Sequence, residues 1–309
     1  MLNQSRRRIV SSSILLLVFV IALLASSQAL AQDTGGQGFP PPQNTEWGQL
    51  VALGNGAIQT FVTVEPSGQP AMVGVYFTAG ALSGLPTTPS DGRWDVVDAA
   101  GKVVTPCCGH EVAVDFPATI AATPFKHFVL NWNPMGHIPA GVYDKPHFDL
   151  HFYTIINEER MAIPVATADT MCVVPNPPGT PGEHPVDVSC ETFEQGMLPL
   201  PEKQAPPGYV AVGAVEPGMG NHLINPAAPE FSGEPFTHTW IYGTYGGKLT
   251  FLEPMIANAF LEEKNAETCA ALTLPEEMPE PGYYPTQYCI RYLANQDAFT
   301  VTLESFVEY

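Results

Sequence analysis

Basic residues are scarce in this sequence. Its 309 residues include 12 lysines and arginines against 31 aspartates and glutamates, which gives a formal net charge of −19 at pH 7. Such a chain repels the phosphates of nucleic acids and anionic membrane surfaces, so we expect neither as a partner. The excess of acidic residues is otherwise what keeps a protein surface well solvated.

The motifs of three common enzyme classes are also missing. The sequence contains no GxSxG, no HExxH and no glycine-rich phosphate loop. No motif therefore supports a serine hydrolase, a zincin or a nucleotide-binding protein. The sequence also indicates no particular small-molecule substrate.

Long apolar runs are missing except near the start. The run ILLLVFVIALLA at 14–25 follows three arginines at 6–8 and precedes Ala-Leu-Ala at 29–31. A basic segment, a short apolar core and a small-x-small site are typical of a secretory signal peptide, predicted here over 1–31. We expect an exported, periplasmic or extracellular protein with no membrane insertion after cleavage. Twin-arginine export and a retained membrane anchor are the alternatives.

The sequence has only six cysteines, and all of them follow the predicted signal peptide. In an oxidising compartment such cysteines are read first as disulfides. The spacing predicts the pairs Cys172–Cys190 and Cys269–Cys289, each closing a loop of about twenty residues and stabilising the fold by about 3 kcal/mol.

Adjacent Cys107 and Cys108 are left over. They pair with each other, stay reduced, or pair elsewhere. A metal site that combines them with His110 is a further alternative, although the sequence shows no second cysteine pair at metal-site spacing.

Helical periodicity is nearly absent as well. Short runs with alternating apolar and polar residues, separated by Gly, Pro, Asn and Asp, predict an all-β, mostly antiparallel sandwich or barrel with long Pro-rich loops. One or two short helices are expected, at 255–264 and at 157–163. We expect a disordered Gly/Pro-rich linker at 32–46 and a β-rich domain at 47–309, either undivided or as two β halves joined around 175–207.

Histidines are few but concentrated. The stretch HFDLH places His147, Asp149 and His151 on one face of a predicted strand, because side chains two residues apart point the same way. The Gly/Pro-rich segment before it, at 134–146, would fold His137 back over the start of the strand. Three histidines and a carboxylate are a usual ligand set for a transition metal. The simpler alternative is a solvated strand face.

A second group of candidates lies further along the chain. A two-residue turn at Gly246 and Gly247 would pair Trp240 with Glu253 and place His238 on the face of Glu253. A register shift of one residue would separate them. His222 follows a glycine-rich turn and completes the pool of candidates.

Several blocks resemble a known family. GVYDKPHFDLHFY and FLEPMI, with PGMGNHLINP and PGYYPTQYCIRY, are similar to signatures of a family of secreted bacterial β-rich proteins of unknown function, represented structurally by a Thermus protein under an extracytoplasmic stress sigma factor. The resemblance implies a β-rich exported domain that forms a homo-oligomer, without an established activity. The recurrent polar positions map onto His137, His147, Asp149, His151, His222 and Glu253.

These observations lead to one hypothesis with two alternatives. The first is an exported protein that binds a divalent transition metal, with zinc the expected ion, through His137, His147 and His151, with His222 or Glu253 completing the shell. Asp149 would be a further ligand or would orient a histidine. The alternatives are a metal-dependent hydrolase or lyase with Glu253 as general base, and a structural oligomer of the cell envelope that holds no metal.

Overall fold

The computed structural model describes residues 38–176 and 181–309. The predicted signal peptide and residues 32–37 of the predicted linker therefore lie outside the described residues. The chain divides into two compact units, Met1–Gln43 and Asn44–Tyr309, and the account below concerns the second unit. Its first strand, β1, begins at Thr45, so the end of the predicted linker is ordered as a strand.

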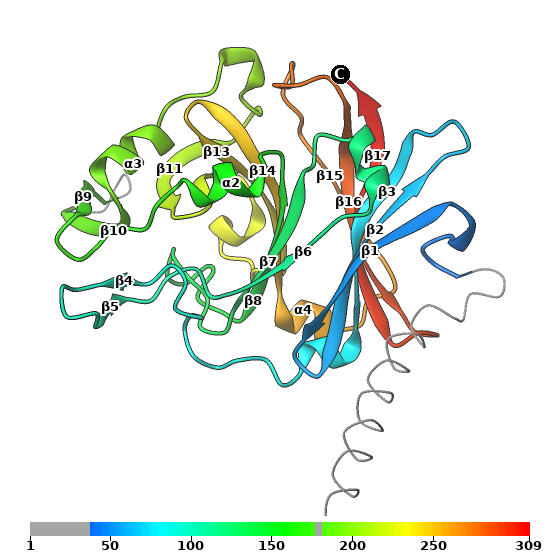
Figure 1. Ribbon diagram of the computed structural model, residues 1–309, viewed down its shortest axis with the longest axis horizontal. Helices are drawn as coiled ribbons and strands as arrows, with labels where there is room; N and C mark the ends of the chain where they lie inside the picture. Colours follow the sequence, from blue (N-terminus) through cyan, green and yellow to red (C-terminus); the bar gives the residue numbers. More distant parts are fainter. Residues whose placement is uncertain (1–37, 177–180) are drawn as a thin grey trace, which may run out of the picture. The chain divides into compact units, whose positions relative to one another are not determined.

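Two antiparallel sheets form the body of this unit (Figure 1). The six-stranded sheet has the order β1 (Thr45–Leu53), β2 (Gly56–Val64), β3 (Pro70–Thr78), β17 (Ala298–Glu308), β16 (Tyr283–Leu293), β15 (Thr268–Ala271). The seven-stranded sheet has the order β11 (Val210–Glu216), β12 (Gly220–Ile224), β13 (His238–Tyr245), β14 (Lys248–Ala257), β8 (His147–Tyr153), β7 (His127–Asn133), β6 (His110–Val114). The predicted all-β sandwich is confirmed, and among the described strands no sheet closes into a barrel.

The core lies between the two sheets. Alternate residues of β8, Phe148, Leu150 and Phe152, belong to one apolar cluster with Val75 and Val301 of the six-stranded sheet. Because side chains alternate along a strand, the remaining residues of β8 project to the outer face of the seven-stranded sheet. All seven residues of β8 are nonetheless buried, so the outer face is covered too.

Short elements surround the outer face. The hairpins β4–β5 and β9–β10 and the helices α2 and α3 lie on the side of the seven-stranded sheet away from the six-stranded one (Figure 1). Their bounds are β4 (Val96–Val97), β5 (Val103–Thr105), β9 (Met171–Pro175), β10 (Glu183–Ser189), α2 (Asn157–Met161) and α3 (Cys190–Gly196).

The described residues also form single 3-10 turns in several connections: η1 (Pro42–Asn44), η2 (Ala79–Leu82), η3 (Ala118–Ala122), η4 (Glu202–Gln204) and η5 (Pro229–Ser232).

Two local expectations need correction. The segment 175–207, expected to be a loop, contains β10 and α3, and the side chain of Ser189 caps α3 by accepting a hydrogen bond from the Thr192 N–H. The helix expected at 255–264 is shorter, α4 (Asn258–Glu262), because β14 continues through Ala257 to pair with β8. At the end of β14, sheet pairing overrides the local helical pattern.

Three disulfides tie the described chain together. The predicted bonds are present: Cys172–Cys190 joins β9 to α3, and Cys269–Cys289 joins the neighbouring strands β15 and β16. The two remaining cysteines, Cys107 and Cys108, are bonded to each other. Three disulfides indicate an oxidising environment. Among the described residues, no helix has the length and apolar character needed to span a membrane.

Candidate metal centre

The outer face of the seven-stranded sheet carries a row of buried polar side chains. His147, Asp149 and His151 of β8 have exposed fractions of 0%, 6% and 0%. On β14, Glu253 lies opposite the position of His151, since Met255 pairs with Asp149. The alternative of a solvated strand face is therefore wrong: these side chains are enclosed and must find partners in the interior.

The connection between β7 and β8 brings His137 to this row. Gly136 has a φ of +67°, and a Cβ there would meet the Tyr143 carbonyl oxygen at 2.2 Å, so only glycine fits the turn. The His137 N–H donates to the same carbonyl at 3.0 Å and closes the loop. His137 thus folds back over the start of β8, as the sequence predicts.

His137, His147 and Asp149 form the first group, called triad A below. The Nε2 atoms of His147 and His137 lie 3.1 and 3.5 Å from the two carboxylate oxygens of Asp149. The Nδ1 atoms of both histidines face backbone carbonyls, of Lys145 at 2.6 Å and of Ile138 at 2.7 Å. An Nδ1–H that donates to a carbonyl leaves the lone pair of a neutral imidazole on Nε2, directed towards the centre of the group.

His151, His222 and Glu253 form the second group, called triad B below. The Nε2 atoms of His151 and His222 lie 3.6 and 3.8 Å from the two carboxylate oxygens of Glu253. His222 reaches the group from β12, and its Nδ1 lies 3.0 Å from the Ala214 carbonyl oxygen. Strands β8, β12 and β14 therefore each supply one member.

His238 belongs to neither group. Trp240 pairs with Pro254, and Ile241 with Glu253. A bulge between Gly243 and Thr244 causes this, because it shifts all pairs beyond it by one residue from the register that the turn alone would set. His238 therefore projects to the opposite face, where its Nδ1 lies 2.6 Å from the Tyr288 hydroxyl. The predicted pairing of Trp240 with Glu253 is wrong for this reason.

The candidate ligands that the sequence assigns to a single site lie in two separate groups. His147 and His151 are four residues apart on one strand, a separation of about 13 Å along the chain. Each therefore joins the carboxylate nearest to it, Asp149 or Glu253, and the two histidines lie in different groups. Asp149 lies within triad A itself.

The electrostatics of the two groups differ. Burial opposes ionisation of Asp149, but the charges of His147 and His137 hold its pKa well below the usual range. Burial, reinforced by the charge of Asp149, raises the pKa of Glu253 well above its usual range. Burial also lowers the pKa of His151 to about 3 and that of His222 to about 4. Triad B thus favours uncharged side chains unless another positive charge is present.

Several of these polar atoms have no partner. His147 Nε2, Asp149 Oδ1, His151 Nε2 and Glu253 Oε2 are buried and make no hydrogen bond within the described part of the chain. His147 Nε2 and Asp149 Oδ1 lie only 3.1 Å apart and still form no hydrogen bond. A hydrogen atom on Nε2 would therefore not point at this oxygen. A buried unpaired polar atom costs about 1–3 kcal/mol, and a cation placed between these atoms would remove that cost.

Sequence reasoning missed one member of this site. The Asn133 amide donates to Asp149 Oδ2 at 2.7 Å and fixes the orientation of the carboxylate. Asn133 pairs with His147 across β7 and β8. The alternation in HFVLNWN, which places Asn131 and Asn133 on one face of β7, was the signal that could have found it.

Comparisons with protein-family models, curated proteins and solved structures find no match to this chain. The resemblance to a secreted bacterial family therefore stays a prediction.

Proposed function

We propose that this exported protein binds divalent transition metal ions on the outer face of its seven-stranded sheet, one in triad A and one in triad B. Zinc is the expected ion, because imidazole and carboxylate ligands suit it. The proposal revises the single site predicted from the sequence to two sites with two histidines and one carboxylate each.

One observation supports this proposal above the others: the spacing of the ligand atoms. Ligands 2.0–2.2 Å from a tetrahedral zinc ion lie about 3.4 Å from one another. The four histidine-to-carboxylate distances, 3.1 and 3.5 Å in triad A and 3.6 and 3.8 Å in triad B, bracket this value. In addition, three of the four histidines present Nδ1 to a backbone carbonyl, which is the usual arrangement of a metal-ligating histidine.

Elemental analysis of the mature protein, purified without a histidine tag, tests the proposal. We expect about two equivalents of metal per chain, with zinc predominant, and the same two after chelation and reloading with Zn²⁺. Ferrous iron is the main competitor, because two histidines and one carboxylate also suit non-haem iron. Protein that holds no metal after reloading would contradict the proposal.

A metal-dependent hydrolase or lyase is the second candidate, and the ligand count favours it. Three protein ligands leave the fourth position of a tetrahedral zinc ion open to water, as in catalytic zinc sites. The side chain of His137 is 39% exposed, so triad A is the group that a substrate would reach. Glu253, predicted as the general base, lies within triad B as a ligand candidate. Asp149 is the carboxylate nearest to the exposed histidine.

A structural homo-oligomer of the cell envelope is the third reading. In that case the histidines would hold no metal and would only form hydrogen bonds. Protein that folds and assembles identically with and without metal, and that takes up none, would favour this reading over the other two.

A further inference from the structure

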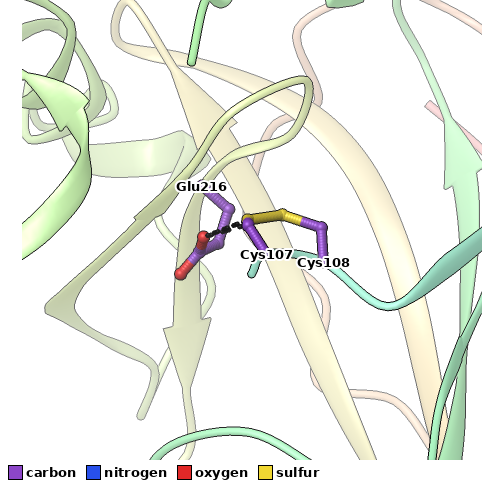
Figure 2. Close-up of side chains that lie close together, drawn as sticks. All are labelled: Cys107, Cys108 and Glu216. Carbon is purple, nitrogen blue, oxygen red and sulfur yellow. Dashed lines mark hydrogen bonds between the residues drawn. A yellow bond between two sulfur atoms is a disulfide. The ribbon is translucent and has the colours of Figure 1, made fainter. Parts of the chain in front are cut away.

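The adjacent cysteines lie beside a half-buried carboxylate that is distant in the sequence. Glu216, at the end of β11, presents Oε2 to both sulfur atoms, 3.4 Å from Cys107 Sγ and 3.8 Å from Cys108 Sγ (Figure 2). His110, the partner considered from the sequence, instead contacts the Thr88 carbonyl oxygen at 2.7 Å. Two sulfurs and one carboxylate oxygen thus lie together, outside triads A and B.

The two cysteines are held in place by contacts other than their disulfide. The Cys107 N–H donates to Asp95 at 3.0 Å, and the Asn131 amide donates to the Cys108 carbonyl at 2.8 Å. Cys108 and Gly109 both have positive φ values, of 68° and 64°, which turn the chain at this point. These contacts involve the backbone and not the sulfurs, so none of them depends on the disulfide.

Glu216 has no lysine or arginine partner in the part of the chain that the structure describes. Among the described residues it forms no ion pair with a lysine or arginine, and a disulfide sulfur carries no proton to donate. Burial raises the pKa of Glu216, although the charge of His137 opposes the shift. Burial and the charges of Glu216 and Asp95 raise the pKa of nearby Asp187 to about 7. In the absence of a cation, these carboxyl groups therefore favour their uncharged forms.

We propose that reduction of the Cys107–Cys108 disulfide creates a third metal site, in which both thiolates and Glu216 bind a thiophilic divalent ion. Soft thiolate ligands distinguish this site from triads A and B, whose ligands are imidazole and carboxylate. The protein would then hold one ion more in reducing than in oxidising conditions.

The chemistry requires a dithiol reductant. A thiolate of the reductant attacks Cys108 Sγ, forms a mixed disulfide with it and releases Cys107 as a thiolate. The second thiol of the reductant then attacks the reductant's own sulfur in the mixed disulfide and releases Cys108 as a thiolate. The oxidised reductant leaves as a cyclic or protein disulfide. Two electrons and two protons pass to the cysteines. Binding of the ion replaces the two thiol protons, which go to solvent. Cys108 is the accessible sulfur, because it is half-buried whereas Cys107 is buried.

Cadmium titration of the full mature chain tests this site. The protein is compared as isolated and after reduction with a phosphine and desalting without oxygen. In the reduced protein we expect one additional equivalent of Cd²⁺ at this site and an ultraviolet sulfur-to-cadmium charge-transfer band. Thiols released from Cys172–Cys190 and Cys269–Cys289 contribute separately, so the signal assigned here is the part lost in C107S/C108S, which keeps those four cysteines.

Glu216→Gln tests the carboxylate without changing the thiols. We expect Cd²⁺ affinity at this site to fall at least tenfold, whereas Glu234→Gln, at an exposed glutamate, leaves it unchanged. A double variant of triads A and B, H147A/H151A, should keep the band, so failure of the third site is distinguishable from failure of the other two. An identical band and stoichiometry in wild type and C107S/C108S, or unchanged affinity in Glu216→Gln, would overturn the proposal.

Discussion

Each candidate ligand on β8 contributes to only one of the two triads. His147 belongs to triad A with Asp149, and His151 to triad B with Glu253. A polar residue that is fully buried in a strand is unfavourable unless it is paired, and each triad contains buried polar atoms without a hydrogen-bond partner among the described residues. Single substitutions should therefore separate the two sites.

His147→Ala and His151→Ala are each expected to lower the metal content from about two equivalents to about one. Each removes one ligand from one triad and leaves the other triad intact. Elemental analysis after reloading with Zn²⁺ measures the change. His238→Ala is the control, because His238 projects to the other face of the sheet. This variant should retain both ions. Full metal content in either ligand variant would show that the substituted histidine is not a ligand.

His127 allows a test of pH dependence outside the triads. Its ring stacks on Tyr153 at a centroid distance of 4.6 Å, and neither ring nitrogen has a hydrogen-bond partner among the described residues. Burial, together with the charge of Arg160, lowers the pKa of His127 to about 4. The unfolded chain takes up this proton near pH 6.5 and the folded chain only near pH 4. Its contribution to stability is therefore complete above pH 6.5 and is lost as the pH falls towards 4.

His127→Phe should reduce this acid sensitivity. Between pH 7 and pH 4.5 the metal-free variant is expected to lose about 2–3 kcal/mol less of its free energy of unfolding than the wild type. Urea denaturation at the two pH values measures the difference. Equal losses in both proteins would show that His127 titrates normally in the folded state.

At the scale of elements, the two faces of β8 carry different kinds of residues. Phe148, Leu150 and Phe152 pack in the core between the sheets, and His147, Asp149 and His151 carry the site. Strand pairing to both β7 and β14 fixes which residues take which face, because a shift of one residue would exchange them.

Phe148→Ala should lower stability without removing the metal. Deleting a buried aromatic ring from a core costs about 3–5 kcal/mol. The variant that remains folded should still bind about two equivalents of zinc, because Phe148 projects away from both triads. Chemical denaturation and elemental analysis of the same preparation check the two halves of this expectation. Loss of metal in folded protein would mean that the faces of β8 are not independent.

The connection between β7 and β8 is the second element that the site depends on. Gly136→Ala would place a Cβ 2.2 Å from the Tyr143 carbonyl oxygen, so the turn must shift and carry His137 with it. We expect weaker binding at triad A, by at least tenfold, and unchanged binding at triad B. Gly141→Ala is the matched control: Gly141 also has a positive φ, +83°, but a Cβ there meets nothing within 4 Å. Isothermal titration with Zn²⁺ measures both sites, and equal effects of the two substitutions would contradict the role of this turn.

At the scale of the whole unit Asn44–Tyr309, the seven-stranded sheet is covered on both faces. The six-stranded sheet covers one face with apolar side chains. On the other face a second apolar cluster that includes Val129, Phe236 and Met255 surrounds the polar row. Several polar atoms of this row are buried without a hydrogen-bond partner among the described residues, which costs stability unless an ion compensates them.

Metal binding should therefore stabilise the whole unit. An ion that binds only the folded state adds about 2.7 kcal/mol for each site at a concentration of 100 times its Kd. The midpoint temperature of thermal unfolding should rise by several degrees with Zn²⁺ and fall again with a chelator. H147A/H151A is the control and should show no such rise. A rise of equal size in that variant would assign the stabilisation to other sites.

The sequence by itself determined the class of fold and most of the ligand candidates. Alternation at a period of two fixes strands and their apolar faces, and it placed His147, Asp149 and His151 on one side. Cysteine spacing also determined two of the three disulfides. These features are local, so a single segment carries all the information they need.

Only the tertiary structure decided which side chains meet. The bulge in β13–β14 removes His238 from the site, and β12 brings His222 to Glu253 from 31 residues away in the sequence. Glu216 reaches Cys107 across 109 positions. Strand order, bulges and loop closure set these contacts, and their energies depend on long-range packing that no local pattern records.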